Sequence, residues 1–218
     1  MGPRVVYQQG DHVCTLFASP EEQLSAAVEY IRQGLARGER CLYVCGEQTP
    51  SEFRGALRAA GIEVAHQEKR GALVLLTKET GHLKGGSFNA SRMIGMLSNA
   101  VEDAIHDGFA GLCAAGDMTW LLDEAAGSDE LAEYEALLND FYKNHRALGL
   151  CQYNRRRLPA EILDHGIATH PTIRIDGHML LTNPFYELPE TAMTRTARGV
   201  GVDERIEQLR SGPVSSGG

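Results

Sequence analysis

The chain has 218 residues, of which 43% are hydrophobic and 23% are charged, and its formal net charge at pH 7 is −8. This composition is that of an ordinary globular protein and excludes a fibrous or a largely disordered chain. A net negative charge without a dense Lys/Arg stripe argues against direct nucleic-acid binding, because the phosphates need basic partners.

No apolar run approaches the roughly 20 residues that span a bilayer, and the first residues lack the basic-then-apolar layout of a signal peptide. The five cysteines are scattered through strand-like segments, and their odd number suits reduced thiols better than a disulfide framework. We therefore expect a cytoplasmic protein that does not contact a membrane.

Short apolar runs alternate with amphipathic stretches along the chain, the pattern of an α/β protein with a mainly parallel sheet. The last two expected strands flank Asp176-Gly177, a pair typical of a two-residue turn, so we expect a C-terminal β-hairpin. The expected strands are Cys14 to Phe17, Cys41 to Cys45, Leu73 to Thr77, Gly111 to Ala115, Gly149 to Tyr153, Thr172 to Ile175 and His178 to Leu181.

Between the strands lie helices with readable starts. A hydroxyl residue, a proline and a capping Glu open two of them, at Ser19-Pro20-Glu21-Glu22 and at Thr49-Pro50-Ser51-Glu52. Ser128 is expected to cap a third helix. The apolar stripes are Leu24, Val28, Ile31 and Leu35 in the first helix, Met93, Leu97 and Val101 in another, and Leu131, Tyr134, Leu138 and Phe141 in the helix after Ser128.

The amino-acid composition changes after Pro189. Residues 191–202 are polar and contain glycine, Asp203 to Arg210 has room for two helical turns, and the last eight residues are of low complexity. We therefore expect one domain over residues 1–188 and a linker or tail over residues 189–218 that is partly helical or disordered.

The segment from Phe17 to Glu22 joins a strand to a helix, which is where a nucleotide-binding α/β protein carries its phosphate loop. Such a loop needs glycine amides and a lysine. Here Pro20 has no N–H, and Glu21 and Glu22 place negative charge at the helix start. The sequence therefore predicts that phosphate is repelled.

Two histidines and two cysteines are candidates for a shared site. His12 and Cys14 are two residues apart on a strand and share a face, and Cys151 and His170 occur near later strand ends. No pair has a recognisable metal-ligand spacing, so ligand contact or core packing is favoured over a metal. Because His12 and Cys14 lie at the start of their strand, the four residues are also compatible with two separate sites.

Asp117 and Trp120 follow a strand directly, at the carboxyl edge where doubly wound sheets bind ligands. The alternative is that Asp117 caps a turn and that Trp120 packs in the core. We find no Ser/His/Asp or Cys/His signature for catalysis and nominate no nucleophile.

Taken together, these segments resemble the MEDS family, the methanogen/methylotroph, DcmR sensory domain, over about residues 8–188. The resemblance implies a three-layer α/β fold of RecA/KaiC type, without a Walker A loop and with helices on both faces of the sheet. It also implies a sensor for small hydrocarbon derivatives in regulators and signalling kinases. The matching motifs are residues 11–17, residues 34–44, Gly116-Asp117-Met118-Thr119-Trp120, Glu133-Tyr134-Glu135, Leu150-Cys151-Gln152-Tyr153, Thr169-His170-Pro171 and Asn183-Pro184-Phe185-Tyr186.

We therefore expect a non-enzymatic sensory or regulatory domain that binds a small ligand and signals to an output domain or a partner protein. No cofactor is expected, and a homodimer is compatible with the sequence. The alternatives are an interaction module without a ligand and a cryptic ATPase that uses Asp117 as a metal ligand. The expected ligand-binding residues are His12, Cys14, Asp117, Trp120, Tyr134, Glu135, Cys151, Tyr153 and His170.

Overall fold

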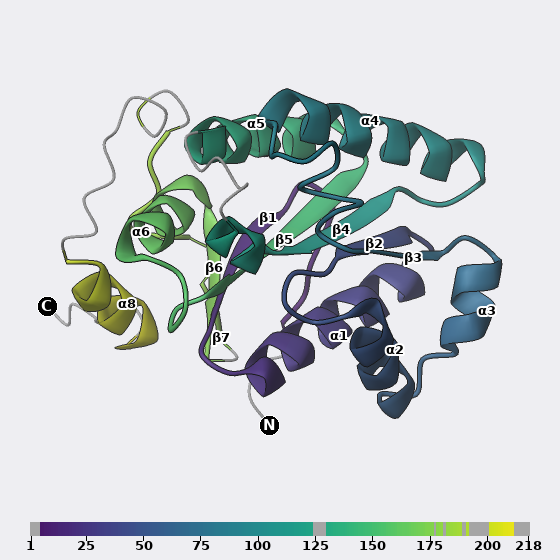
Figure 1. Ribbon diagram of the computed structural model, residues 1–218, viewed down its shortest axis with the longest axis horizontal. Coiled ribbons are helices and arrows are strands. Elements are labelled where there is room, and N and C mark those ends of the chain that lie inside the picture. Colours follow the sequence, from purple (N-terminus) through teal and green to yellow (C-terminus); the bar gives the residue numbers. More distant parts are fainter. Residues whose placement is uncertain are drawn as a thin grey trace, which may run out of the picture.

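The computed structural model describes residues 5–123, 130–176, 178–180, 182–188, 191 and 201–211. Its centre is a seven-stranded sheet in the order β3-β2-β4-β5-β1-β6-β7 (Figure 1). The first six strands are parallel, and β7 runs antiparallel to β6. The strands are β1 His12–Phe17, β2 Arg40–Val44, β3 Leu73–Leu76, β4 Leu112–Asp117, β5 Ala147–Asn154, β6 Thr172–Ile175 and β7 His178–Leu180.

Helices cover both faces of the sheet, which confirms the expected α/β class (Figure 1). One apolar core joins the sheet to α1, α2 and α3, and a second joins its other face to α4, α5, α6 and α8. The helices are α1 Pro20–Ala36, α2 Pro50–Ala59, α3 Val64–Lys69, α4 Ala90–His106, α5 Leu131–Asn144, α6 Ala160–Thr169 and α8 Val202–Ser211, with a 3-10 turn, η1, at Met118–Leu122.

Helix α1 begins as its sequence predicts, with Ser19 as N-cap and Pro20 in the first turn. The Ser19 hydroxyl accepts a hydrogen bond from the amide of Glu22 at 3.3 Å. The Glu22 carboxylate accepts instead from the amide of Ala18 at 2.7 Å, one residue before the N-cap. The helix start is therefore occupied by a carboxylate of the chain itself.

Two helices were not predicted, and both lack a local start signal. Helix α3 has only six residues, and no side-chain hydrogen bond caps it at Glu63. Helix α6 follows Pro159, which caps it without a side-chain bond. Ser128, the expected N-cap of α5, lies outside the described residues, and the N-cap of that helix is Glu130, without a side-chain hydrogen bond. Tertiary packing, and not capping chemistry, holds these helices in place.

Helix α8 lies within one residue of the helix expected in the tail. It packs on α6 and buries three apolar side chains, Val202, Ile206 and Leu209. An ion pair of 2.6 Å between Arg205 and the buried Asp164 of α6 adds a polar contact. This part of the tail is therefore attached to the domain.

Over the described residues, none of the helices combines the length and the hydrophobicity that crossing a lipid bilayer requires.

Candidate functional site

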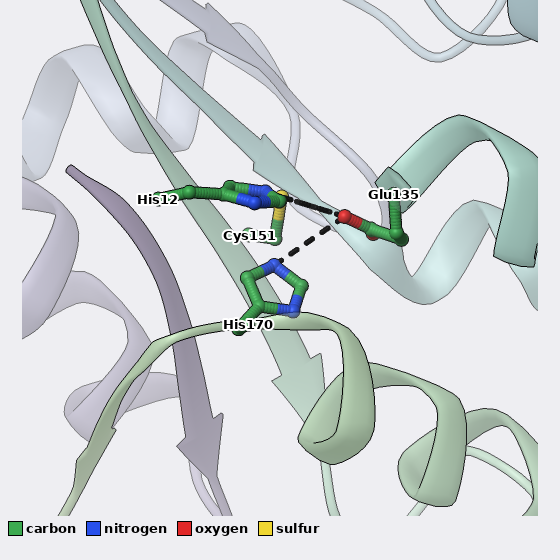
Figure 2. Close-up of side chains that lie close together, drawn as sticks. All are labelled: His12, Glu135, Cys151 and His170. Atoms are coloured by element: carbon green, nitrogen blue, oxygen red, sulfur yellow. Dashed lines mark hydrogen bonds and ion pairs between the residues drawn. The ribbon is translucent and has the colours of Figure 1, made fainter. Parts of the chain in front are cut away.

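Four polar side chains from four elements meet between the sheet and helices α5 and α6. His12 is the first residue of β1, Cys151 lies in β5, Glu135 lies in α5 and His170 follows α6 directly. All four are buried, and one potential ligand atom from each lies within 4.8 Å of the others (Figure 2). We call these four residues the buried cluster.

The structure resolves the question whether these residues form one site or two. His12 lies opposite Gly149 of β5, and Cys151 lies only two residues farther along the same strand. His170 precedes β6, which is the other neighbour of β1. The cluster is therefore one site in the amino half of the sheet, with Glu135, and not Cys14, as its fourth member.

Glu135 holds the centre of the cluster. Its Oε2 atom lies 3.3 Å from Nε2 of His12 and 3.4 Å from Nε2 of His170. The sulfur of Cys151 lies 3.6 Å from Nε2 of His12 and 4.0 Å from the same carboxylate oxygen. The other oxygen, Oε1, accepts a hydrogen bond of 2.5 Å from the hydroxyl of Tyr153.

Two further contacts determine how the imidazoles are oriented. The amide nitrogen of Asn139 donates to the carbonyls of Glu135 and Thr169, so its oxygen is turned toward Nδ1 of His12 at 3.1 Å. Nδ1 of His170 donates to the carbonyl of Gly166 at 2.7 Å. Both Nδ1 atoms therefore carry hydrogen when the rings are neutral, and both Nε2 lone pairs face Glu135.

The environment keeps the carboxyl of Glu135 ionised and the ring of His170 neutral. Burial alone would raise the pKa of Glu135, but His170, His12 and the hydrogen bond from Tyr153 lower this pKa to about 2. Burial, together with His12, lowers the pKa of His170 to about 3. Burial and the charge of Glu135 raise the pKa of the Cys151 thiol well above its usual range.

Cys14 and Tyr153 lie beside the cluster. Cys14 is paired with Cys151 across β1 and β5, on the same face of the sheet, and is fully buried in the apolar core. The ring of Tyr153 packs so tightly under α6 that a Cβ at Gly166 would lie 2.9 Å from it. That close approach brings the end of α6, and with it His170, to the cluster.

Asp117 lies on the opposite face of the sheet from the cluster. It is the partner of Gln152, whose side chain turns toward Tyr43 and α1, whereas Cys151 turns toward α5. The Asp117 carboxylate accepts from the amide of Thr119 at 2.9 Å and caps η1. The structure thus favours the capping interpretation over ligand contact.

Trp120 is buried in the core next to α4 and α5, which matches the packing interpretation. Its ring stacks on His82 with centroids 5.0 Å apart and lies 4.5 Å from the ring of Phe88. Phe88 in turn meets Tyr134 edge to face at 5.2 Å. Tyr134 therefore connects this aromatic group to helix α5.

Tyr134 and Cys151 also line a small cavity between the sheet, α4 and α5. Its volume is about 20 Å³, which is room for about one water molecule. Most of its wall is apolar. The lining residues are Leu42, Val44, His82, Met93, Leu97, Ala114, Ala115, Gly116, Met118, Tyr134, Tyr142, Leu150 and Cys151.

The sequence did not single out Asn139, Tyr142 or His82, although all three border these features. Asn139 and Tyr142 lie one and two helical turns after Glu135, so they share its face of α5. That spacing was the available signal for both residues. His82 lies in a loop, and no local pattern marked it.

Comparisons with known proteins agree with this architecture. A family model described as "MEDS: MEthanogen/methylotroph, DcmR Sensory domain" matches residues 11–171. Over 162 residues the chain is 25% identical to the transcriptional repressor DcmR of Methylorubrum extorquens. That match covers 73% of this chain and 58% of the repressor, so the chain spans less than two thirds of that relative.

Among solved structures, the KaiC-like protein PH0186 from Pyrococcus horikoshii OT3 has a TM-score of 0.53 at 13% identity, covering 77% of this chain and 71% of that one. This likeness concerns the fold, and it confirms the expected RecA/KaiC-like architecture. The family model spans most of the chain and includes all four residues of the buried cluster. The chain therefore belongs to the MEDS family of sensory domains.

Proposed function

We propose that this domain binds a small apolar molecule in the cavity beside Cys151 and passes the event through α6 and α8 to an output partner. The observation that carries the proposal is the position of the cavity. Its wall is built by the sheet and by helices α4 and α5, and it includes Cys151 of the buried cluster. A ligand in this cavity would therefore contact both the apolar core and the buried cluster.

The chemistry of the wall selects the ligand class. The lining is mostly aliphatic, with Tyr134, Tyr142, His82 and Cys151 as the polar or aromatic groups. Space for about one water admits only a molecule of a few atoms unless α4 and α5 separate. A small hydrocarbon derivative fits these limits better than a sugar or a nucleotide does.

A chain of contacts leads from the cavity to the tail. Cys151 contacts His12 and Glu135, and His170 next to Glu135 ends α6. Helix α6 contacts α8 through the ion pair of Asp164 with Arg205. A ligand that favours one arrangement of α5 and α6 would shift the docking of α8 by its difference in affinity for the two states.

Hydrogen exchange tests this proposal. We expect xenon and one-carbon alkyl halides to bind and to change the protection of residues 201–211. Ala114→Val, which adds methyl groups to the cavity wall, should reduce the response. Ala27→Val, an equally buried change in α1 on the other face, should keep it. Binding without any change of protection in α8 would contradict the proposed signalling path.

We further propose that the domain does not hydrolyse nucleotides. The first turn of α1 holds Glu21 and Glu22, and the amide of Ala18 already binds the Glu22 carboxylate. Asp117, the metal ligand of the alternative ATPase, is used as a cap. Calorimetry with ATP and magnesium should detect no binding, and micromolar affinity would restore the ATPase hypothesis.

The remaining alternative is an interaction module without a ligand, as monomer or homodimer. Native mass spectrometry distinguishes it from the ligand-binding sensory function. A small molecule retained by the purified chain supports the sensory proposal. For the output, the repressor DcmR suggests transcription as the process controlled, since its sequence extends well beyond the matched region.

A further inference from the structure

We propose that the buried cluster of His12, Glu135, Cys151 and His170 is a binding site for one divalent transition-metal ion, with zinc as the best match. This inference is independent of the proposed sensory function. The sequence favoured packing or ligand contact for these residues because their spacing matches no metal motif. The structure changes this interpretation, since β1, β5, α5 and the end of α6 bring the four donors together.

Three of the distances between the donor atoms match the edges of a tetrahedral metal site. Bonds of about 2.0–2.1 Å to nitrogen or oxygen and about 2.3 Å to sulfur give tetrahedral edges of about 3.3–3.6 Å. The two imidazole-to-carboxylate distances are 3.3 and 3.4 Å, and the imidazole-to-sulfur distance is 3.6 Å. The distance from the sulfur to the carboxylate oxygen is longer, at 4.0 Å, and all four donor atoms lie within 4.8 Å of one another.

The orientation of the donors also favours a cation. Asn139 and the carbonyl of Gly166 hold Nδ1 of the two rings, so that Nε2 of each ring is turned toward Oε2 of Glu135. Nε2 of His170 makes no hydrogen bond within the described part of the chain, although it is fully buried. A metal ion would give this nitrogen a partner.

The residues around the donors act as the outer contacts that metal ligands require. Tyr153 holds Oε1 of Glu135 and leaves Oε2 for the metal, while Asn139 and Gly166 fix the two imidazoles. Such hydrogen bonds to the far side of each ligand set its orientation and its basicity.

The charges of the donors favour a divalent metal ion. Binding displaces the proton of the Cys151 thiol to solvent, so the site offers one thiolate, one carboxylate and two neutral imidazoles. Two negative charges balance a divalent ion and leave a neutral complex, which a fully buried site favours strongly. Four protein donors complete a tetrahedron, so the site resembles structural and not catalytic zinc centres.

The test uses the untagged full-length chain, stripped with a chelator and titrated with zinc and with cobalt(II). We expect one equivalent of metal per chain, a higher melting temperature, and for cobalt the visible bands of a tetrahedral complex with a near-ultraviolet thiolate band. Cys151→Ser should lose the thiolate band and bind at least about 100-fold more weakly. Cys113→Ser, an equally buried cysteine on the other face, should behave as the wild type.

Tyr153→Phe provides a second variant in case Cys151→Ser does not fold, because it removes only the hydrogen bond to Glu135. We expect its metal affinity to fall about 10- to 100-fold. Less than one bound equivalent in the wild type, or a cobalt spectrum without a thiolate band, would overturn the proposal and leave a buried ion pair of His12 and Glu135. Either result is separate from the ligand test, which reads the protection of α8.

Discussion

His82 is a buried histidine that should make the folded protein less stable in acid. Burial lowers its pKa from 6.5 to about 3, so the folded protein keeps this ring neutral where the unfolded chain protonates it. Stability should therefore fall as the pH decreases from about 6.5 to about 3, by up to about 1.4 kcal/mol per pH unit for this group.

His82→Phe keeps an aromatic ring against Trp120 and removes the titrating group. The number of protons taken up on unfolding in acid should therefore fall by about one, and the dependence of stability on pH should become less steep. Urea unfolding at a series of pH values between about 7 and about 4 measures the slope. His66→Phe in the exposed part of α3 is the control and should leave the slope as it is. An unchanged slope in His82→Phe would show that His82 does not resist protonation.

Gly149 is required by the close approach of α5 to β5. A Cβ at this position would lie 2.3 Å from two ring carbons of Tyr142, which is shorter than any real contact. We expect Gly149→Ala to lower the free energy of unfolding by about 1–3 kcal/mol. Adding Tyr142→Ala should remove the conflict, so a double-mutant cycle should show a favourable coupling.

Gly55→Ala in helix α2 is the matched control for that cycle, because nothing lies within 4 Å of its added Cβ. It should stabilise the protein by about 0.5–1 kcal/mol, as glycine in a helix interior is unfavourable. Equal destabilisation at both glycines would rule out the steric explanation.

At the scale of elements, α8 is the helix whose attachment is easiest to loosen. Ile206 is one of its three buried apolar side chains and packs in the core that includes α6. Ile206→Ala should reduce the free energy of local opening of residues 202–211 by about 2 kcal/mol while the sheet stays protected. Hydrogen exchange followed by mass spectrometry resolves the two regions.

Glu204→Ala, at an exposed position of the same helix, is the control and should leave the protection of α8 nearly unchanged. If Ile206→Ala lowered the protection of the sheet as much as that of α8, the helix would be part of the folding unit and not a separate element that signals.

Helices α2 and α6 differ in how well the local sequence predicts them. Helix α2 has both halves of its capping box, with Thr49 and Glu52 bonded to each other's backbone amides, and it was predicted from four residues. Helix α6 has no such signal, and it is buried over most of its length between the sheet and α8. Its sequence is shaped by packing on several sides, which removes the amphipathic period that prediction depends on.

At the scale of the whole molecule, the domain boundary expected at residue 188 can be tested by truncation. A chain that ends at residue 188 should keep its circular dichroism and its cooperative unfolding, because the sheet and all of its two cores except Val202, Ile206 and Leu209 precede that point. It should also self-associate in a concentration-dependent manner, since the apolar face that α8 covers becomes exposed.

Light scattering of the truncated chain, with a chain ending at Ser211 as the control, measures this self-association. Loss of cooperative unfolding in the truncated chain would place α8 inside the domain and move its boundary beyond residue 188.

The sequence by itself determined the class of fold, most of the strands, the start of α1 and α2, and the negative charge at the start of α1. Capping, helical period and the charge of Glu21 and Glu22 act within a few residues, so they can be read without knowing the fold. The order of motifs also identified the family before any contact was known.

The membership of the site was decided only by the tertiary structure. His12 and Cys151 are 139 positions apart, and they meet because β1 inserts between β5 and β6. Glu135 was expected near the ligand, but its central position depends on how α5 packs on β5. Asp117 fell on the other face for the same reason: the order and register of strands are set by contacts distant in sequence, which no local pattern encodes.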